Sequence, residues 1–431
     1  MSRGWRIDQL PEHIGAQVRV TGWVTHVRSS GKVRFFLVRD GTGELQVVAR
    51  AGDGGDPLLS QIAALTQETA VAVGGLVQAD PRSPGGVELR ATELSVIGSS
   101  DAYPLSPKEH GIDFLMDHRH LWVRSSRQAA ALRIRARIAH AIRAFLDDAG
   151  FVLADPPILT PAAAEGTTSL FGVDYFGDPA FLSQSGQLYL EALAMSLGRV
   201  YSFGPTFRAE KSKTRRHLME FWMVEPEIAF CDFEENLEWQ ERLVSYVVAD
   251  VLAHRSGDLA VLERDTAALE RIEPPFPRIS YDEAIERLRA AGFATKWGDD
   301  FGSPEETALA GMFDRPVFVH RFPAHQKAFY MQPDPARPEV ALAADLLAPE
   351  GYGEIVGGSQ RIHDRDLLRA RLAEHGLDPA TYSWYLDLRR YGSVPHSGFG
   401  LGLERLVAWI AGLEHVRETI PFPRTLSRVW P

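Results

Sequence analysis

The stretch Phe203-Gly-Pro-Thr-Phe-Arg-Ala-Glu210, followed by Lys211-Ser-Lys-Thr-Arg-Arg-His217 and by Glu220-Phe-Trp222, decides the fold of this chain. It predicts a strand, a cationic turn and a returning strand. Arg208 and Glu210 are two residues apart, so we expect their side chains on the same face of the first strand. Such a hairpin can hold a polyanion while Glu210 accepts a hydrogen bond from a base. A surface hairpin with a basic tip is the alternative.

Two more segments of the sequence carry motifs that bear on the fold and on ligand binding. Gly398-Phe-Gly-Leu-Gly-Leu-Glu-Arg-Leu-Val-Ala-Trp409 indicates an extended stretch that runs into an amphipathic helix, with Arg405 in its first turns. Glycines allow close approach of the backbone to a ligand, and a helix start suits phosphate. Gly150-Phe-Val-Leu-Ala-Asp-Pro-Pro-Ile-Leu159 follows a predicted helix over Gln128–Asp148. The glycine-spaced motif that begins at Gly398 is, by itself, weak evidence for a ligand site.

Length and composition set the outer bounds. A chain of 431 residues is comfortable for two or three domains. No apolar run approaches the roughly 18 residues that a membrane span needs, and the start carries no apolar signal core. We therefore expect no membrane association. The one cysteine, Cys231, excludes an internal disulfide and fits a cytoplasmic location.

The charge is unevenly distributed. The net charge is −11, yet residues 1–100 contain ten Lys or Arg and ten Asp or Glu, so the acidity lies in the remainder. From Arg19 through Arg39 there are five basic residues and no acid. A local basic stripe on an acidic body favours steered binding of a polyanion. A chance run on a solvated sheet face is the alternative.

Residues 1–100 predict an all-β domain. Five short β-branched or alternating runs indicate strands, and a helix that ends near Thr66 separates the third from the fourth. This pattern fits an OB-fold barrel, a common platform for single-stranded nucleic acid. Phe35 and Phe36 face opposite sides of one strand, so only one can be core, and the other could stack on a base. The runs are Val18–Val24, Arg34–Val38, Glu44–Val48, Val71–Val77 and Val87–Val96.

A linker over 101–125 leads to a domain over 126–431, in which strands alternate with helices. The pattern predicts an α+β fold built around an antiparallel sheet flanked by helices. Residues 255–315 carry no readable chemistry. The expected helices are 128–148, 187–198, 233–255 and 364–375, and the expected strands are Phe181–Ser183, Val200–Glu210, Glu220–Ile228, Val317–Arg321, Phe329–Gln332, Ala341–Leu347 and Gly353–Arg361.

In this order and at these separations, the three segments resemble motifs 1, 2 and 3 of the class II aminoacyl-tRNA synthetases. Over nearly its full length, most weakly over 235–315, the chain resembles the asparaginyl enzymes of the subgroup that also contains the aspartyl and lysyl enzymes. The segments that narrow the resemblance are Glu165-Gly-Thr-Thr-Ser-Leu-Phe171, Tyr175-Phe-Gly177, Gln184-Ser-Gly-Gln-Leu-Tyr-Leu-Glu191, Trp222-Met-Val-Glu-Pro-Glu227 and Glu354-Ile-Val-Gly-Gly-Ser-Gln-Arg361.

One of these segments bears on the substrate. In the aspartyl relatives, the segment that begins at Gln184 typically reads Gln-Ser-Pro-Gln, followed by a lysine. Here Gly186 replaces the proline and Glu191 closes the segment. Loss of the lysine removes a cation suited to a substrate carboxylate and favours a neutral amide.

The resemblance implies ATP-dependent activation of L-asparagine to asparaginyl-adenylate and its transfer to tRNA(Asn). Arg208 would bridge the ATP α-phosphate and the amino acid carboxylate. Glu210 would accept from the adenine amino group, and Phe221 would stack on the ring. His217 and Arg405 would hold the outer phosphates. The amino acid carboxylate attacks ATP directly, so no nucleophilic side chain is needed.

The resemblance also assigns the amino acid site and the metal. Glu165 and Gln187 would hold the α-ammonium of the substrate. Glu225 would accept from the side-chain amide, and Arg361 would donate to the side-chain oxygen. Glu354 would bind Mg²⁺, with Asp345 as the second protein ligand, because this ion prefers carboxylate and phosphate oxygens. Aspartyl relatives of archaeal type carry a serine where Gly357 stands here, so the number of bound metal ions is open.

Two further expectations concern macromolecular partners. Arg28, Phe35 and Gln46 match the positions at which the aspartyl relatives read the central uridine of the anticodon. Asp and Asn anticodons share that uridine. Motif 1, from about Ala129 to Leu159, is expected to form the interface of a C₂ homodimer.

Three alternative functions involve another class of protein or another substrate. A non-catalytic tRNA-binding paralogue is disfavoured by the intact Arg208, Glu210, Glu354 and Arg405. An asparagine synthetase derived from the same scaffold would lack the anticodon-binding barrel that residues 1–100 supply. An aspartyl-tRNA synthetase, including one that serves two tRNAs, is the nearest rival, and activation tested with Asn and with Asp separates the two.

Overall fold

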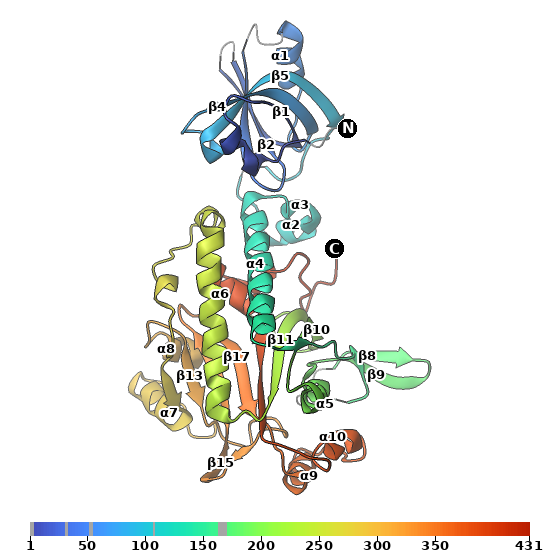
Figure 1. Cartoon of the computed structure of the whole chain (residues 1–431), viewed down its shortest axis with the longest axis vertical. Coiled ribbons are helices and arrows are strands. Elements are labelled where there is room, and N and C mark those ends of the chain that lie inside the picture. The colour runs from blue at the N-terminus through green and yellow to red at the C-terminus, as the bar shows by residue number, and fades with distance from the viewer. Residues whose placement is uncertain (1–3, 31–32, 51–54, 107, 163–169) are drawn as a thin grey trace. The chain divides into compact units, whose positions relative to one another are not determined.

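The computed structural model describes residues 4–30, 33–50, 55–106, 108–162 and 170–431. It divides into two compact units, Met1–Leu115 and Met116–Pro431 (Figure 1). The segment expected to be a linker, 101–125, contains two short helices, α2 (Ile112–Asp117) and α3 (Arg119–Trp122). Within the described residues, no helix is both long and apolar enough to cross a membrane.

The first unit is a closed five-stranded barrel, with neighbours in the order β1-β2-β3-β5-β4. All five expected strands and the helix between the third and fourth are present. Phe36 is buried in the barrel core and Phe35 is half-buried on the other side of β2, which confirms that the two rings face opposite ways. The elements are η1 (Ile7–His13), β1 (Gln17–Ser30), β2 (Val33–Arg39), β3 (Glu44–Arg50), α1 (Gly55–Ala63), β4 (Ala70–Ala79), η2 (Pro84–Gly86) and β5 (Val87–Gly98).

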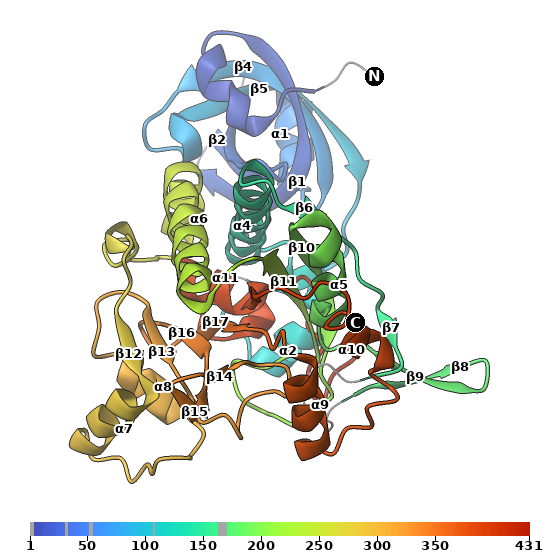
Figure 2. The ribbon, with the colours of Figure 1, turned by 60° about the horizontal axis from the view of Figure 1, so that its bottom comes forward.

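The second unit is built on a sheet of eight strands, in the order β12-β13-β16-β17-β18-β11-β10-β6. The six central strands pair antiparallel, as expected, but β12 and β6 add a parallel strand at each edge. Two smaller sheets lie outside it, and both views show the β8–β9 hairpin projecting from this unit (Figures 1 and 2). The strands are β6 (Val152–Leu153), β7 (Leu159–Thr160), β8 (Gly172–Tyr175), β9 (Asp178–Leu182), β10 (Arg199–Phe207), β11 (Glu220–Ala229), β12 (Arg278–Ser280), β13 (Val317–His320), β14 (Pro333–Asp334), β15 (Arg337–Ala341), β16 (Ala343–Ala348), β17 (Gly353–Gln360) and β18 (His396–Gly402).

Helices α4 and α6 run side by side in this unit (Figures 1 and 2). An ion pair between Arg137 and Asp250 joins them, and their apolar residues share one core with the central strands. Helix α4 spans Ser126–Asp148 and helix α6 spans Phe233–Val261. The helices that follow α4 in this unit, apart from α6, are α5 (Gln187–Leu197), η3 (Leu269–Arg271), α7 (Tyr281–Ala290), α8 (Ser303–Ala310), α9 (Arg365–Glu374), α10 (Ser383–Asp387), α11 (Leu403–Ala411) and η4 (Val416–Glu418).

The alternation along β11 positions the site. Val224 and Ile228 point into the core shared with α4 and α6. The side chains of Met223, Glu225 and Glu227 alternate with these two and point to the other face of the strand, where they line a cavity. Because neighbouring side chains of a strand point to opposite faces, one short strand both anchors the core and presents two carboxylates.

Two expectations about strands are wrong. β10 ends at Phe207, so Arg208 and Glu210 lie beyond the strand, in a segment that leaves the sheet toward the cationic turn. Residues 329–332 form no strand, because Phe329 and Tyr330 are buried in a separate apolar cluster with α9 and α10. Met331 makes only an isolated bridge to Arg361.

Candidate active site

Two neighbouring cavities meet in the second unit. The larger, of about 330 Å³, is lined by residues that include Glu225 and Arg361. The smaller, of about 110 Å³, is lined by residues that include Phe221 and Arg405. Four residues line both cavities: Arg208, Met223, Glu354 and Gly400. The site therefore suits two ligands, or a ligand of two parts, that join beside Arg208 and Glu354.

The smaller cavity brings together all six residues expected at ATP: Arg208, Glu210, His217, Phe221, Glu354 and Arg405. The guanidinium of Arg208 lies 5.4 Å from the ring centroid of Phe221. Glu210 Oε2 lies 3.9 Å from His217 Nε2. Burial, helped by the positive charge of Arg405, lowers the pKa of His217 and so favours the neutral form of this side chain.

Arg405 lies in the first turn of helix α11 and contacts Glu354. Its Nη1 donates to the Glu354 carbonyl oxygen at 2.9 Å and lies 3.3 Å from Glu354 Oε2. Both side chains are partly exposed to the cavity. A cation and a carboxylate held together in this way can bind an anionic phosphate and a metal cation next to each other.

The two carboxylates expected at the metal converge on Gly357. A Cβ atom at this glycine would lie 2.8 Å from Glu354 Oε1 and 3.6 Å from Asp345 Oδ1, so the glycine leaves the space between them open. No set of three or more His, Cys, Asp and Glu side chains in the described parts of the chain is arranged to hold a metal ion alone. Two carboxylates nevertheless fit Mg²⁺, because this ion usually takes its other ligands from substrate phosphates and water.

Asp345 has an additional partner that the sequence did not predict. Lys327 Nζ donates to Asp345 Oδ2 at 2.7 Å and lies 3.8 Å from the ring centroid of Phe322. Burial raises the pKa of Asp345 to about 6, and the Lys327 ammonium opposes this rise. Asp345 thus shares its charge with Lys327, whereas Glu354, which contacts Arg405, faces the junction of both cavities.

A third carboxylate comes from the region that carried no readable chemistry. Glu306, on α8, lines the larger cavity and accepts from Arg216 Nη1 at 2.8 Å. Burial, together with the nearby charge of Glu354, raises the pKa of Glu306 to about 7. Arg216 also donates to the Gly351 carbonyl oxygen, so α8 and the loop before β17 fix the cationic turn that follows Arg208.

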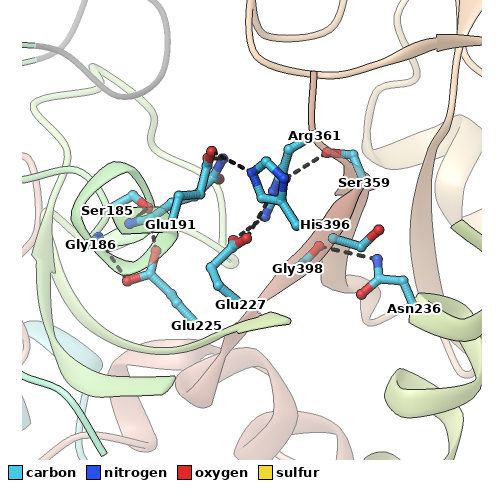
Figure 3. A network of polar contacts seen from close by, with 12 residues as sticks. Ser185, Gly186, Glu191, Glu225, Glu227, Asn236, Ser359, Arg361, His396 and Gly398 are labelled. Carbon is cyan, nitrogen blue, oxygen red and sulfur yellow. Dashed lines mark hydrogen bonds and ion pairs between the residues drawn. The ribbon is translucent and has the colours of Figure 1, made fainter. Parts of the chain in front are cut away.

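Glu225 lies at the wall of the larger cavity and accepts from Ser185, Gly186 and Ser202. Figure 3 shows the first two of these contacts. The Ser185 hydroxyl donates to Oε1. The Gly186 N–H donates to Oε2 at 2.9 Å, and the Ser202 hydroxyl reaches the same oxygen at 3.3 Å. A carboxylate fixed by donors on one side can accept from a ligand N–H on the other.

Arg361 faces the same cavity with its charge already balanced (Figure 3). Its Nη2 and Nε donate to the two oxygens of Glu227 at 2.5 and 3.2 Å, and its Nη1 donates to the Ser359 hydroxyl at 2.6 Å. Burial alone would lower the pKa of Arg361, but the charge of Glu227 raises it. The guanidinium is therefore a permanent, rigidly oriented donor.

A fully buried network supports Gln187. Glu191 accepts from the Tyr385 hydroxyl at 2.8 Å and from Arg389 Nη2 at 2.6 Å, and it lies 2.9 Å from His396 Nε2. Gln187 Nε2 donates to the same carboxylate at 3.1 Å. Because the amide nitrogen is used in this way, the amide oxygen is the atom of Gln187 that can accept from a ligand in the larger cavity.

The structure thus gathers the expected ATP, amino acid and metal residues around the two joined cavities, except one. Glu165 lies outside the described residues. The site residues that the sequence did not single out are Ser185, Glu227, Glu306 and Lys327. Of these, only Glu227 gave a local signal, because it stands two residues from Glu225 on one strand face.

The three residues expected at the anticodon lie together on the barrel of the first unit. Arg28 and Phe35 are directly opposite in the β1–β2 pairing, and Arg28 Nη2 donates to Gln46 Oε1 at 3.4 Å. Gln46 Nε2 donates in turn to the Ser83 hydroxyl and to Glu88 at 3.0 and 3.1 Å. A partly exposed ring beside a cation and an amide is a surface on which an unpaired base can stack.

Two family models match the chain. The model described as tRNA synthetases class II (D, K and N) matches residues 111–426. The model described as OB-fold nucleic acid binding domain matches residues 18–97. These matches confirm the fold class expected from the sequence, an OB-fold barrel followed by a class II catalytic domain.

Relatives match over nearly the whole length. An asparagine–tRNA ligase of Pelotomaculum thermopropionicum is 57% identical over 425 residues, which cover 99% of each chain. One of Chloroflexus aurantiacus is 58% identical over 432 residues, which cover 99% of this chain and 98% of the relative. The crystal structure of asparaginyl-tRNA synthetase from Pyrococcus horikoshii complexed with asparaginyl-adenylate superposes with a TM-score of 0.97 at 46% identity, over all of both chains.

Proposed function

Because this chain belongs to the class II tRNA synthetases of the D, K and N family, we propose that it activates L-asparagine with ATP to asparaginyl-adenylate and transfers the asparaginyl group to tRNA(Asn). The observation that carries this proposal is the meeting of the two cavities at Arg208. Two pockets that share a cationic contact can hold an amino acid and a nucleotide so that their reacting groups meet.

The residues of the smaller cavity mainly position ATP for the reaction. Adenine fits between Phe221 and Arg405 with its amino group on Glu210. Arg208 lies where the α-phosphate and the asparagine carboxylate must approach each other, and it neutralises charge that grows during the attack. The carboxylate oxygen forms a bond to the α-phosphorus, and pyrophosphate leaves toward His217 and Arg405. No side chain has to form a covalent intermediate.

The amino acid side selects a neutral side chain. Gln187 receives the α-ammonium, with Glu165 as the second expected acceptor. Arg361 donates to the side-chain oxygen, which asparagine and aspartate both offer. Glu225 accepts from the amide N–H, which only asparagine has.

Mg²⁺ is part of the proposal, with Glu354 as the principal protein ligand and Asp345 as the second. A bound ion would supply positive charge to the phosphate groups of ATP. Glu306, Arg216 and Arg405 keep Glu354 in place for it.

ATP–pyrophosphate exchange with Asn and with Asp as the amino acid tests the function. We expect exchange that depends on Mg²⁺ and on Asn, with Asp far less effective, because Glu225 repels a carboxylate. Charging of transcribed tRNA(Asn) and tRNA(Asp) is the second measurement. Equal exchange with both amino acids would favour a non-discriminating aspartyl enzyme, and exchange with neither would favour a non-catalytic tRNA-binding protein.

A homodimer and a cytoplasmic location complete the proposal. β6 is an edge strand of the large sheet, and its Val152 and Leu153 are 44% and 45% exposed. Ile158 and Leu159, further along motif 1, are also exposed. Apolar side chains on an edge strand favour pairing with a second copy about a two-fold axis. The chain has one cysteine, Cys231, and therefore no internal disulfide, as suits a reducing compartment.

The barrel gives a prediction about the anticodon. Phe35→Ala is expected to weaken tRNA charging by about 1–3 kcal/mol, the usual value of one base stack on an aromatic ring. Amino acid activation should not change, because Phe35 belongs to the other unit. Aminoacylation and pyrophosphate exchange are measured side by side, and an equal loss in both would mean that Phe35 only stabilises the barrel.

A further inference from the structure

The peptide N–H of Gly186 contacts the carboxylate that faces the substrate amide. Gly186 caps helix α5 with φ −84° and ψ −6°, a conformation open to any L-residue. Its N–H donates to Glu225 Oε2 at 2.9 Å, while the Ser185 hydroxyl donates to Oε1 (Figure 3). The backbone geometry therefore does not explain why residue 186 is a glycine.

Packing explains the glycine instead. A Cβ atom at position 186 would overlap the Cγ atom of Pro156 and would lie 3.4 Å from Glu225 Oε2. The absence of a side chain lets the peptide group approach both Pro156 and Glu225. Proline would suit a backbone near this φ, but it has no N–H to donate.

We propose that Gly186 is a specificity-determining residue, whose N–H holds Glu225 as a fixed acceptor for the amide group of asparagine. This inference rests on the proposed function. Donors on one side of a carboxyl group favour its ionised form and fix its plane. An ionised carboxylate accepts from an amide N–H and repels a substrate carboxylate. A carboxyl group released from these donors can turn away or take up a proton, and a protonated carboxyl can donate to aspartate.

The test separates the N–H from the space around it. Pro156→Ala removes the Cγ atom with which a Cβ atom at 186 would overlap, and it keeps the Cβ atom of residue 156, which would lie 3.2 Å away. In that background, Gly186→Ala adds a Cβ atom and keeps the N–H, whereas Gly186→Pro adds carbon atoms and removes the N–H. The ratio of kcat/KM for Asn to that for Asp, from pyrophosphate exchange, is measured for Pro156→Ala and for both double variants.

We expect the alanine double variant to keep the ratio of Pro156→Ala within about threefold. The proline double variant should narrow the ratio by roughly 10- to 100-fold, the usual worth of a hydrogen bond to a charged group. Equal ratios in the two double variants would overturn the proposal.

A second variant covers the case in which the proline protein does not fold. Ser185→Ala removes the donor to Oε1 without adding an atom, and it should narrow the ratio in the same direction. An unchanged ratio in a folded Ser185→Ala protein would also overturn the proposal. Failure of the proposed function looks different, because the wild-type protein would then show no Asn-dependent exchange at all.

Discussion

Replacing Arg208 by alanine is expected to lower Asn-dependent pyrophosphate exchange on the order of 10²- to 10³-fold, the cost of removing one donor that stabilises transition-state charge. Arg208 lines both cavities, so its loss affects the point where the carboxylate and the α-phosphate meet. The contact strengthens as the bond forms, and kcat should therefore fall more than KM rises.

The fold should survive this change, because Arg208 lies beyond the end of β10 and is only partly buried. Arg287→Ala is a matched control, since this arginine pairs with Glu283 within helix α7. Thermal unfolding of both variants is compared with that of the wild type. Near-normal exchange by a folded Arg208→Ala protein would remove the central argument for the reaction.

Replacing Glu225 by glutamine is expected to reduce discrimination between Asn and Asp more than any other single change at the site. Asn and Asp are nearly isosteric, so charge must separate them. A like charge about 4 Å from Glu225 costs roughly 4 kcal/mol at an effective dielectric near 20. This corresponds to about a thousandfold difference in kcat/KM, which a site without an editing step needs.

The glutamine variant should lose Asn activity and narrow the Asn-to-Asp ratio, because an amide accepts less well than a carboxylate and does not repel one. Glu220→Gln, the same substitution on the same strand, should leave the ratio unchanged. Steady-state exchange with each amino acid gives the two ratios. An unchanged ratio in Glu225→Gln would place discrimination elsewhere, for example in the segment 165–177.

The sequence by itself determined the features that local patterns and motifs encode. Period-two alternation put Phe35 and Phe36 on opposite faces of one strand, because strand geometry is a local property. The three motifs made the resemblance to the family visible, since each is a continuous segment of the sequence. The same local reasoning extended the first hairpin strand too far, because nothing in the sequence showed where its pairing would stop.

Only the tertiary structure decided how the site residues are held. Glu227 and Arg361 are 134 residues apart, and Glu191 and Arg389 are 198 apart, yet each pair forms a buried ion pair. The contact of the Gly186 N–H with Glu225 likewise joins two separate segments. Such contacts depend on which strands become neighbours in the sheet and on which side chains fill the space between them. A single sequence carries no local signal for that, whereas packing fixes it.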